Sequence, residues 1–259
     1  MSSVSSSQPT ARPPLRLALT SLLRADFVVF LKNRRTLIIS ILLPVFLLVT
    51  TNSSKAVQHF GGALFVIGLA IAYGMAATSI MGYALTVARD REKGVFQRLR
   101  VTPTPTWTIM TSRLGMQVIA NLIIALVVVI IGTSLHHISL SAGQFGLVLL
   151  VSILGGAVFL SIGQALVGLV KSADTVNAAG RLLLIALVLL ASLGQSGALG
   201  SAWESISTWT PVGIVMTLFA GVLNLSAWNH TDTLSLAACV AYIIVFAGIG
   251  IRWFQWDAR

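Results

Sequence analysis

Long apolar stretches without a single charged residue dominate this chain and restrict what it can fold into. No Lys, Arg, Asp or Glu occurs between Arg35 and Lys55, over residues 60–88, or over the 57 residues from Leu114 to Val170. An α-helix pairs its own backbone hydrogen-bonding groups, and about 20 apolar residues of helix cross the hydrocarbon core of a bilayer. The stretches lack the alternation of polar and apolar residues that marks barrel strands. The sequence therefore predicts an all-α integral membrane protein.

The composition of the chain agrees with a membrane protein. Of its 259 residues, 56% are hydrophobic and 9% are charged, whereas about 25% are charged in soluble domains. The formal net charge of +10 does not indicate nucleic-acid binding, because that activity needs a basic face on a folded soluble domain. We expect membrane lipids, and no nucleic acid, to contact the chain.

The apolar stretches predict six membrane spans, separated where polar and turn-forming residues gather, as at His136–Gly143. The spans are expected at about residues 36–54, 61–88, 114–135, 144–170, 182–200 and 233–251. Residues 171–181 are expected to form a short polar loop between the fourth and fifth spans.

Two segments precede the first span. The Ser- and Pro-rich residues 1–14 predict a disordered tail. In residues 15–33 apolar side chains recur at helical spacing with Arg16 and Arg24 on another face, which predicts an amphipathic helix in the membrane interface. Residues 15–259 are expected to form a single transmembrane domain.

The distribution of basic residues predicts the orientation of the spans. With this arrangement, 16 of the 17 Lys and Arg residues fall on one side of the membrane and only Lys55 falls on the other. Basic residues accumulate on the cytoplasmic side of membrane proteins. Both termini and the charged segment Ala88–Trp107, which joins the second and third spans, are therefore expected in the cytoplasm.

An apolar segment after Pro211 is too short for a span. It has only about 15 residues, and Trp203, Trp209 and Trp228 surround it. Segments of this length are typically re-entrant or interfacial, and Trp prefers the interface. We expect a re-entrant or interfacial segment before the last span, and both placements stay open at this point.

Missing motifs narrow the function. The chain contains no GxxxxGK[ST] sequence and no Gly-Lys dipeptide, so a P-loop cannot hold nucleotide phosphates here. If ATP drives this protein, another subunit binds it. None of the seven Asp and Glu residues falls within the middle of a predicted span, which disfavours an ATP-independent secondary carrier, because such carriers usually keep an ionisable group inside the bilayer.

No metal site or catalytic centre is predicted. Cys239 is the only cysteine and, within an apolar run, is expected to be a small buried side chain. His136 and His137 are adjacent, so on a helix they point about 100° apart and chelate poorly. The motifs GxSxG and HExxH are absent, so we expect a chain that is not an enzyme. A purely structural anchor would not need six spans.

A few polar residues fall inside the predicted spans, among them Gln117, Asn121 and Gln164. Gln117 and Asn121 are the residues that we assign, as candidates, to a substrate path. Hydrogen bonding between helices is an equally good explanation for each of these polar side chains.

The charged segment is predicted to contain a short amphipathic helix. Val95, Phe96 and Leu99 share one face, Gly94 permits a turn before them, and Pro103 ends the helix. Such a helix, lying parallel to the membrane, fits a groove on a cytoplasmic partner. Ordinary binding of its basic flanks to lipid headgroups explains the segment equally well.

The same segment resembles a family motif. In that motif an acidic entry and a Lys-Gly or Arg-Gly turn precede a run that ends in Thr-Pro. The matching residues here are Glu92, Lys93, Gly94, Val95, Phe96, Arg98, Leu99, Thr102 and Pro103. The chain is similar to the permease subunits of type-2 ABC exporters, which include the daunorubicin-resistance and polysaccharide-export branches.

This resemblance implies roles for particular segments. The charged segment would be the coupling helix, which docks on a separate ATPase subunit. The docking residues would be Glu92, Gly94, Val95, Phe96, Arg98, Leu99, Thr102 and Pro103. The hairpin around Trp209 and Pro211 would cover the outer end of the pathway.

The resemblance also implies partners and function. ATP and Mg²⁺ would be bound by the ATPase, with no cofactor in this chain, and a pair of permeases would assemble with a pair of ATPases. We expect a permease subunit in the bacterial cytoplasmic membrane that exports an amphipathic drug or a lipid-like molecule. Export of a polysaccharide or glycolipid is the alternative within the family, and a secondary carrier is the alternative outside it.

Overall fold

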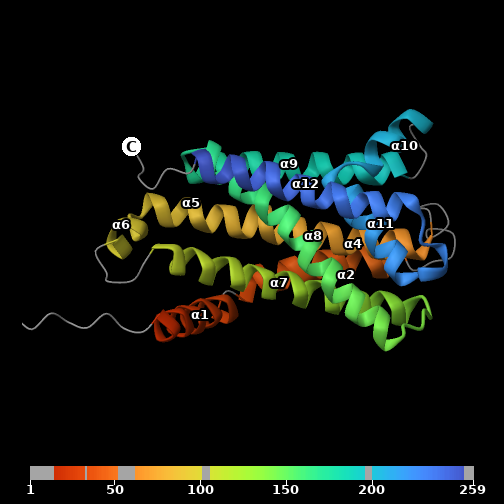
Figure 1. Ribbon diagram of the computed structural model, residues 1–259, viewed down its shortest axis with the longest axis horizontal. Coiled ribbons are helices and arrows are strands. Elements are labelled where there is room, and N and C mark those ends of the chain that lie inside the picture. The colour runs from red at the N-terminus through yellow and green to blue at the C-terminus, as the bar shows by residue number, and fades with distance from the viewer. Residues whose placement is uncertain (1–14, 33, 52–61, 101–105, 196–199, 254–259) are drawn as a thin grey trace, which may run out of the picture.

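The computed structural model is a bundle of helices with roughly aligned long axes (Figure 1). It describes residues 15–32, 34–51, 62–100, 106–195 and 200–253, and these contain no strand. The elements are α1 (Leu15–Lys32), α2 (Arg34–Thr50), α4 (Ala63–Ala76), the π-helix η1 (Ala77–Tyr83), α5 (Ala84–Glu92), α6 (Val95–Arg100), α7 (Thr106–Leu135), α8 (Ala142–Leu169), α9 (Ala173–Gln195), α10 (Ser201–Thr208), α11 (Pro211–Leu223), the 3₁₀ turn η2 (Leu225–Ala227) and α12 (His230–Trp253).

Five helical stretches in the described part are long and apolar enough to cross a membrane. They are Ala63–Glu92, Met110–Leu135, Ala142–Leu169, Ala173–Gly194 and His230–Trp253. In α2 the apolar portion Ser40–Thr50 is shorter, and α10 and α11 form a pair bent by 83°. The prediction of an all-α membrane protein with a helical hairpin before the last span is confirmed.

Several helix boundaries differ from the sequence expectation, among them the start of α7 at Thr106, eight residues before the expected third span. The second span continues without a break from Ala63 to Glu92. The fifth helix begins at Ala173, within the stretch expected to be a loop. Polar residues cap its start: the Ser172 hydroxyl accepts a hydrogen bond from the backbone N–H of Thr175 at 3.1 Å. Polar residues at a helix N-terminus pair exposed N–H groups, so this helix start resembles a loop in sequence.

Helix α11 lies inside the bundle between α4 and α8. A Cβ atom at Gly68 of α4 would lie 3.1 Å from the carbonyl oxygen of Met216, and one at Gly155 of α8 would lie 3.1 Å from the side chain of Val215. Small residues allow membrane helices to approach closely, which compensates for the weak hydrophobic driving force in lipid. The short helix is therefore held by backbone proximity on two sides.

The π-helix η1 approaches α8 very closely. A Cβ atom at Gly163 would lie 2.6 Å from the carbonyl oxygen of Ser79, while Gly180 of α9 approaches Ile80 from another side. π-Helical turns are rare and occur frequently at functional sites. The widened turn fits here only because α8 carries a glycine opposite it.

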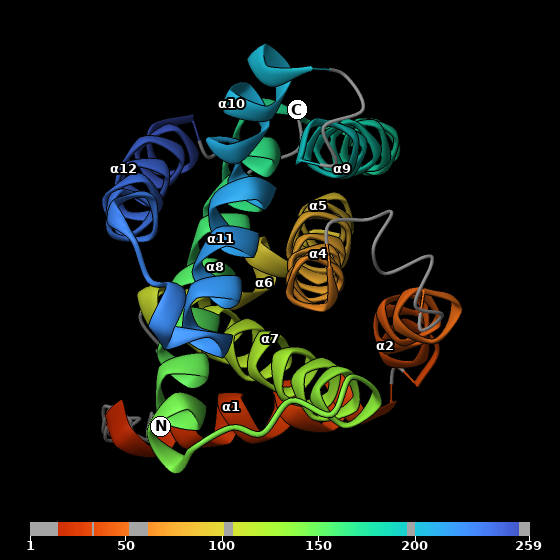
Figure 2. The same ribbon diagram turned by 90° about the vertical axis from the view of Figure 1, so that its right-hand side faces the viewer.

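Different helices lie at the two ends of the bundle. Figure 1 shows α1, α6 and the last turns of α12 at one end, and α10 and α11 at the other. Figure 2 looks along the bundle from the α10 side, with α8 near the centre, α12 on one flank and α4 and α5 on the other. We call these the α6 end and the α10 end.

The packing at Gly163 generates a stability prediction. Gly163→Ala should lower the melting temperature of the purified protein in nanodiscs, because overpacking of this kind costs about 1–3 kcal/mol. Gly146→Ala, on the same helix with nothing within 4 Å of the added Cβ, should leave the melting temperature unchanged or raise it, because alanine favours helix by about 1 kcal/mol. Equal melting temperatures for the two variants would contradict the observed contact.

Candidate functional site

The α5–α6 junction, Asp90–Phe96, lies at the α6 end and makes a tight turn. The backbone N–H of Lys93 donates to the carbonyl oxygen of Arg89 at 3.0 Å and closes α5. Gly94 has φ +67°, a conformation that glycine adopts without a steric penalty. The turn at Gly94, which the sequence predicts, directs α6 away from the axis of α5 (Figure 1).

Arg91 connects this junction to the end of α8. Its side chain is only 3% exposed, and its guanidinium donates to the carbonyl oxygens of Val167 at 3.0 Å, Val170 at 2.7 Å and Lys171 at 2.5 Å. The last carbonyls of a helix have no partner within the helix and carry its partial negative charge. Arg91 therefore caps α8 with a positive charge.

Glu92 caps the start of the neighbouring helix, α9, with a negative charge. Its carboxylate accepts a hydrogen bond of 2.6 Å from the backbone N–H of Ala173, at the first turn of α9. A helix N-terminus carries partial positive charge and unpaired N–H groups, so an anion is favoured there. Two adjacent residues of α5 thus hold the two helix ends that meet between α8 and α9, and we call Arg91 and Glu92 the α8–α9 clamp.

Phe96 anchors α6 to the bundle. Its ring is 2% exposed and belongs to an apolar cluster that includes Leu160 of α8 and Val176 of α9. The guanidinium carbon of Arg113 lies 5.2 Å from the centre of the ring, within the range of a cation–π interaction. Arg113 also forms an ion pair of 2.5 Å with Asp90. Helix α7 is therefore joined to both α5 and α6.

A further contact extends these links to α1. The Ser112 hydroxyl of α7 donates to the Asp26 carboxylate of α1 at 2.5 Å. Leu23 of α1 also lies against Gly115 of α7. Through α7, the amphipathic helix α1 is part of the same polar framework as the α5–α6 junction.

The structure places the predicted docking residues differently from one another. Phe96, assigned to partner contact by resemblance, directs its ring into the apolar cluster. Glu92, assigned in the same way, is exposed, and its carboxylate is bonded to the start of α9. Lys93 and Gln97 are exposed, and Gly94 and Val95 are half-buried. Arg98 and Leu99 belong to α6, but their side chains lie outside the described part, as do Thr102 and Pro103 entirely. Docking by this segment stays a prediction.

Sequence reasoning did not find the roles of Arg91, Arg113 and Asp90. The acceptors of Arg91 lie 76 to 80 positions further along the chain, and no periodic pattern connects them. The only sequence feature that indicated these roles was the run of opposite charges at Asp90, Arg91 and Glu92, at the end of the second span.

Gln117 and Asn121, the candidates for a substrate path, are bonded to η1. Asn121 is 1% exposed; its Oδ1 accepts from the Thr78 hydroxyl at 3.1 Å and its Nδ2 donates to the Ser79 hydroxyl at 3.2 Å. Gln117 Nε2 lies 3.4 Å from the same Ser79 hydroxyl. This geometry gives both residues a role in holding α7 on the π-helix, and their place on a substrate path stays a prediction.

The bent pair α10–α11 enters the bundle from the α10 end. At its turn, the Thr210 hydroxyl accepts from the backbone N–H of Gly213 at 3.1 Å, and Pro211 is the first residue of α11. The carbonyl oxygen of Trp209 accepts from the Tyr242 hydroxyl at 3.0 Å, and Tyr242 lies halfway along α12. The turn thus reaches deep into the bundle while both ends of the pair remain at one end, which is the geometry of a re-entrant hairpin.

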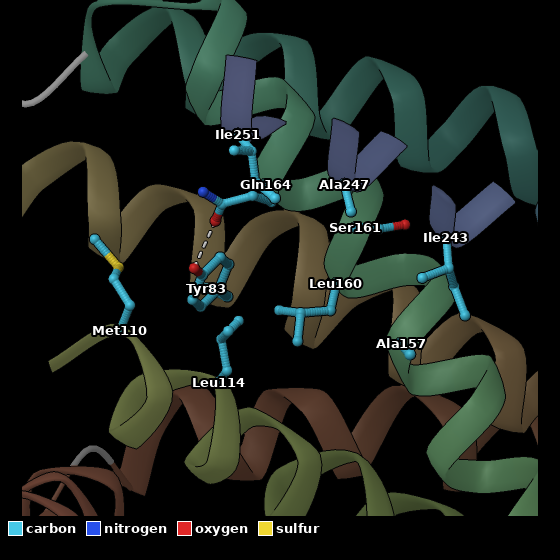
Figure 3. Close-up of a pocket in the computed structure, with 10 residues that line it drawn as sticks. All are labelled: Tyr83, Met110, Leu114, Ala157, Leu160, Ser161, Gln164, Ile243, Ala247 and Ile251. Atoms are coloured by element: carbon cyan, nitrogen blue, oxygen red, sulfur yellow. Dashed lines mark hydrogen bonds between the residues drawn. The ribbon is translucent and has the colours of Figure 1, made fainter. Parts of the chain in front are cut away.

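A cavity of about 440 Å³ lies between η1, α7, α8 and α12 (Figure 3). Its lining is apolar apart from three residues, Tyr83, Ser161 and Gln164. The Tyr83 hydroxyl donates to Gln164 Oε1 at 2.6 Å. Gln117 and Asn121 are not among the residues that line it.

Comparison with known proteins identifies the family. A sequence model of the ABC-2 type transporter family matches residues 18–224, about four fifths of the chain. The chain belongs to the ABC-2 type transporter family. The match includes the α5–α6 junction and the α10–α11 hairpin, and it ends before α12. No curated protein matches the chain.

The α8–α9 clamp of this ABC-2 type protein generates a prediction about Arg91. Arg91→Met should lower the melting temperature, because it leaves the buried carbonyl oxygen of Val167 without its donor, at a cost of about 1–3 kcal/mol, and removes the bonds to two part-buried carbonyl oxygens. Arg91→Lys should be intermediate, because a lysine ammonium lacks the fork of donors that reaches several carbonyls. Arg89→Met, at an exposed position of the same helix, is the matched control. A melting temperature for Arg91→Met equal to that of the control would contradict the capping role.

Proposed function

We propose that this chain is the membrane subunit of an ATP-driven exporter for amphipathic drugs or lipid-like molecules. Membership of the ABC-2 type transporter family makes it a permease of an ABC transporter, a class that works with an ABC ATPase. The observation that carries the proposal is the α5–α6 junction, which is bonded to α7, α8 and α9 within a few residues. ATP and Mg²⁺ would be held by the ATPase, and this chain would be non-catalytic.

The junction offers a direct route for movement. An ATPase that displaced α6 would push Phe96 against α8 and α9 and would move α7 through Arg113. The clamp would shift the turn between α8 and α9 in the same direction, because Arg91 and Glu92 hold both of its ends. A bundle with two arrangements, biased by the nucleotide state of the ATPase, is the minimum mechanism.

The far end of the bundle would respond through α11. This helix is packed between α4, which continues into α5, and α8, which the clamp holds. A shift of α5 relative to α8 would therefore change the space available to the α10–α11 hairpin. The hairpin would open or cover the outer end of the pathway as the two states alternate.

The charges of the described residues support an orientation with the α6 end in the cytoplasm. Arg89, Arg91, Lys93 and Arg113 lie at or near the α5–α6 junction, whereas α10, α11 and the first turns of α12 contain no Lys or Arg. Positive charge collects on the cytoplasmic side of membrane proteins. We place the protein in the bacterial cytoplasmic membrane, with both termini inside and the hairpin outside.

A second copy of the permease completes the proposed assembly. Apolar side chains on one face of α2, among them Leu42, Phe46 and Val49, are exposed in the single chain. Lipid or a second permease would cover such a face. Docking of an ATPase on each permease would give the paired arrangement.

Docking is tested with the exposed side of the junction. The chain is expressed with candidate ABC ATPases, purified by a tag on the permease, and assayed for bound ATPase and for ATP hydrolysis in nanodiscs. Lys93→Glu combined with Gln97→Glu should reduce ATPase recovery, because both positions are exposed at the proposed contact. Arg252→Glu, a charge reversal at the end of α12, is the matched control. Full recovery with the double variant would overturn docking at this surface.

Coupling is tested with Glu92→Gln. A neutral amide keeps the size of the side chain but replaces a charge-assisted hydrogen bond, so the link to α9 should weaken by about 1–2 kcal/mol. We expect ATP-driven transport of a fluorescent amphiphile in inside-out vesicles to fall several-fold per bound ATPase, with ATPase recovery measured on the same preparation. Glu204→Gln, at an exposed site of α10, should retain wild-type transport. Unchanged transport by Glu92→Gln would remove the clamp from the coupling route.

A further inference from the structure

We call the cavity in Figure 3, which lies between η1, α7, α8 and α12, the recess. Its floor is formed by α8 and Tyr83, and its walls are formed by α7 and α12, which each pack against α8. Leu114 on the α7 wall is 37% exposed and Ile251 on the α12 wall is 75% exposed. Because these rim residues lie on membrane-spanning helices, the recess opens sideways toward the bilayer.

The recess lies in the half of the membrane nearer the α6 end. Tyr83 precedes the end of α5 at Glu92 by nine residues, a distance of about 14 Å along a helix. Gln164 is five residues from the end of α8, and Ile251 is two residues from the end of α12. With the proposed orientation, this is the depth of the inner leaflet.

The polar groups of the recess form a pair with unused hydrogen-bonding capacity. The Tyr83 hydroxyl donates to Gln164 Oε1 at 2.6 Å, so the Tyr83 oxygen still has lone pairs. The Gln164 carboxamide has two N–H donors. A primary amide that faces an apolar recess favours a ligand with a hydroxyl or carbonyl oxygen, because an unmatched polar group in such surroundings is costly.

The charge of the lining indicates the class of ligand. None of the described residues that line the recess is charged at neutral pH. Arg113 lies beside Leu114, but its charge is paired with Asp90 at 2.5 Å. Burial of an ionic headgroup without a counter-charge is unfavourable, so an uncharged ligand fits best.

We infer that this recess binds one uncharged amphiphile taken laterally from the inner leaflet, with its oxygen-bearing headgroup at Gln164 and its apolar body along α8. The volume of about 440 Å³ falls in the range of about 300–1,000 Å³ for ligand pockets. The inference rests on the proposed export function only for the transport steps after binding; binding itself requires neither ATP nor the partner subunit.

The test uses the purified full chain in nanodiscs without an ATPase. A monoacylglycerol carrying a photoreactive diazirine in its acyl chain is the probe, and labelled peptides are located by mass spectrometry. Diazirine-bearing phosphatidylglycerol, which is anionic, and a diazirine-bearing alkane without a headgroup are the comparison probes. We expect the monoacylglycerol to label α8 and α12 around the recess, and the other two probes to label these sites several-fold less.

Variants separate specific binding from general lipid contact. Gln164→Leu should weaken saturable labelling about five- to tenfold, the effect of losing one hydrogen bond of about 1–1.5 kcal/mol. Ala247→Phe should abolish labelling by filling the recess. Ala241→Phe, at an exposed position of the same helix, should retain it. All three variants should keep the wild-type melting temperature within a few degrees, and a fourth variant, Tyr83→Phe, tests the pair if Gln164→Leu fails to fold.

Three outcomes would overturn the inference. Equal labelling by the anionic probe would remove the preference for an uncharged ligand. Equal labelling of Ala247→Phe and Ala241→Phe would show that the recess is not the site. Disulfide cross-linking between copies with cysteine at Leu114 or Ile251, in a Cys239→Ala background, would show that a second permease covers the mouth. If labelling behaves as expected but no ATPase-driven transport is found, the export function fails while the binding site stands.

Discussion

The fit between two adjacent charges and two helix ends is the contact on which the α6 end depends. A helix that stops near the membrane surface leaves its last carbonyls and first N–H groups without internal partners, and these groups carry opposite partial charges. Arg91 meets the carbonyls at the end of α8, and Glu92 meets the first N–H of α9. The connection between α8 and α9 is short, and α5 provides hydrogen-bond partners for both helix ends. We therefore expect α5 and the connection between α8 and α9 to move together.

Helix α8 extends the influence of the clamp across the bundle. Near its other end, the Gln144 carboxamide donates to the carbonyl oxygens of Val222 and Leu223 at 3.2 Å, which caps α11. Between the two polar ends, glycines at positions 155 and 163 bring α8 close to α11 and η1. A helix fixed at both ends and closely packed along its length transmits displacement as a rigid body. That is what a transporter driven from one face of the membrane requires.

The polar side chains within the membrane fall into two groups with different uses. Thr78, Ser79 and Asn121 bond to one another where η1 meets α7, so they consume their own capacity and stabilise the helix packing. Tyr83 and Gln164 form a pair at the edge of a recess and retain capacity for a ligand. The difference is one of surroundings, because each group combines a hydroxyl with a carboxamide. An amide that faces an apolar recess can select a ligand, whereas an amide that is bonded to a neighbouring helix stabilises the helix packing.

The sequence by itself determined the fold class, the order of the long helices, the turn at Gly94 and the bent pair around Pro211. Of the six spans that it predicted, five are long apolar helices in the described part, and the first has only the shorter apolar portion Ser40–Thr50. These features depend on apolar run length, glycine and proline, which act over a few residues. The tertiary structure decided that Phe96 faces inward, that Glu92 caps α9, that the polar start of α9 is helix, and that Gln164 lies beside Tyr83. The Tyr83–Gln164 pair spans 81 positions of the chain. Such partners depend on how the helices pack against one another, and a local sequence pattern does not predict that packing.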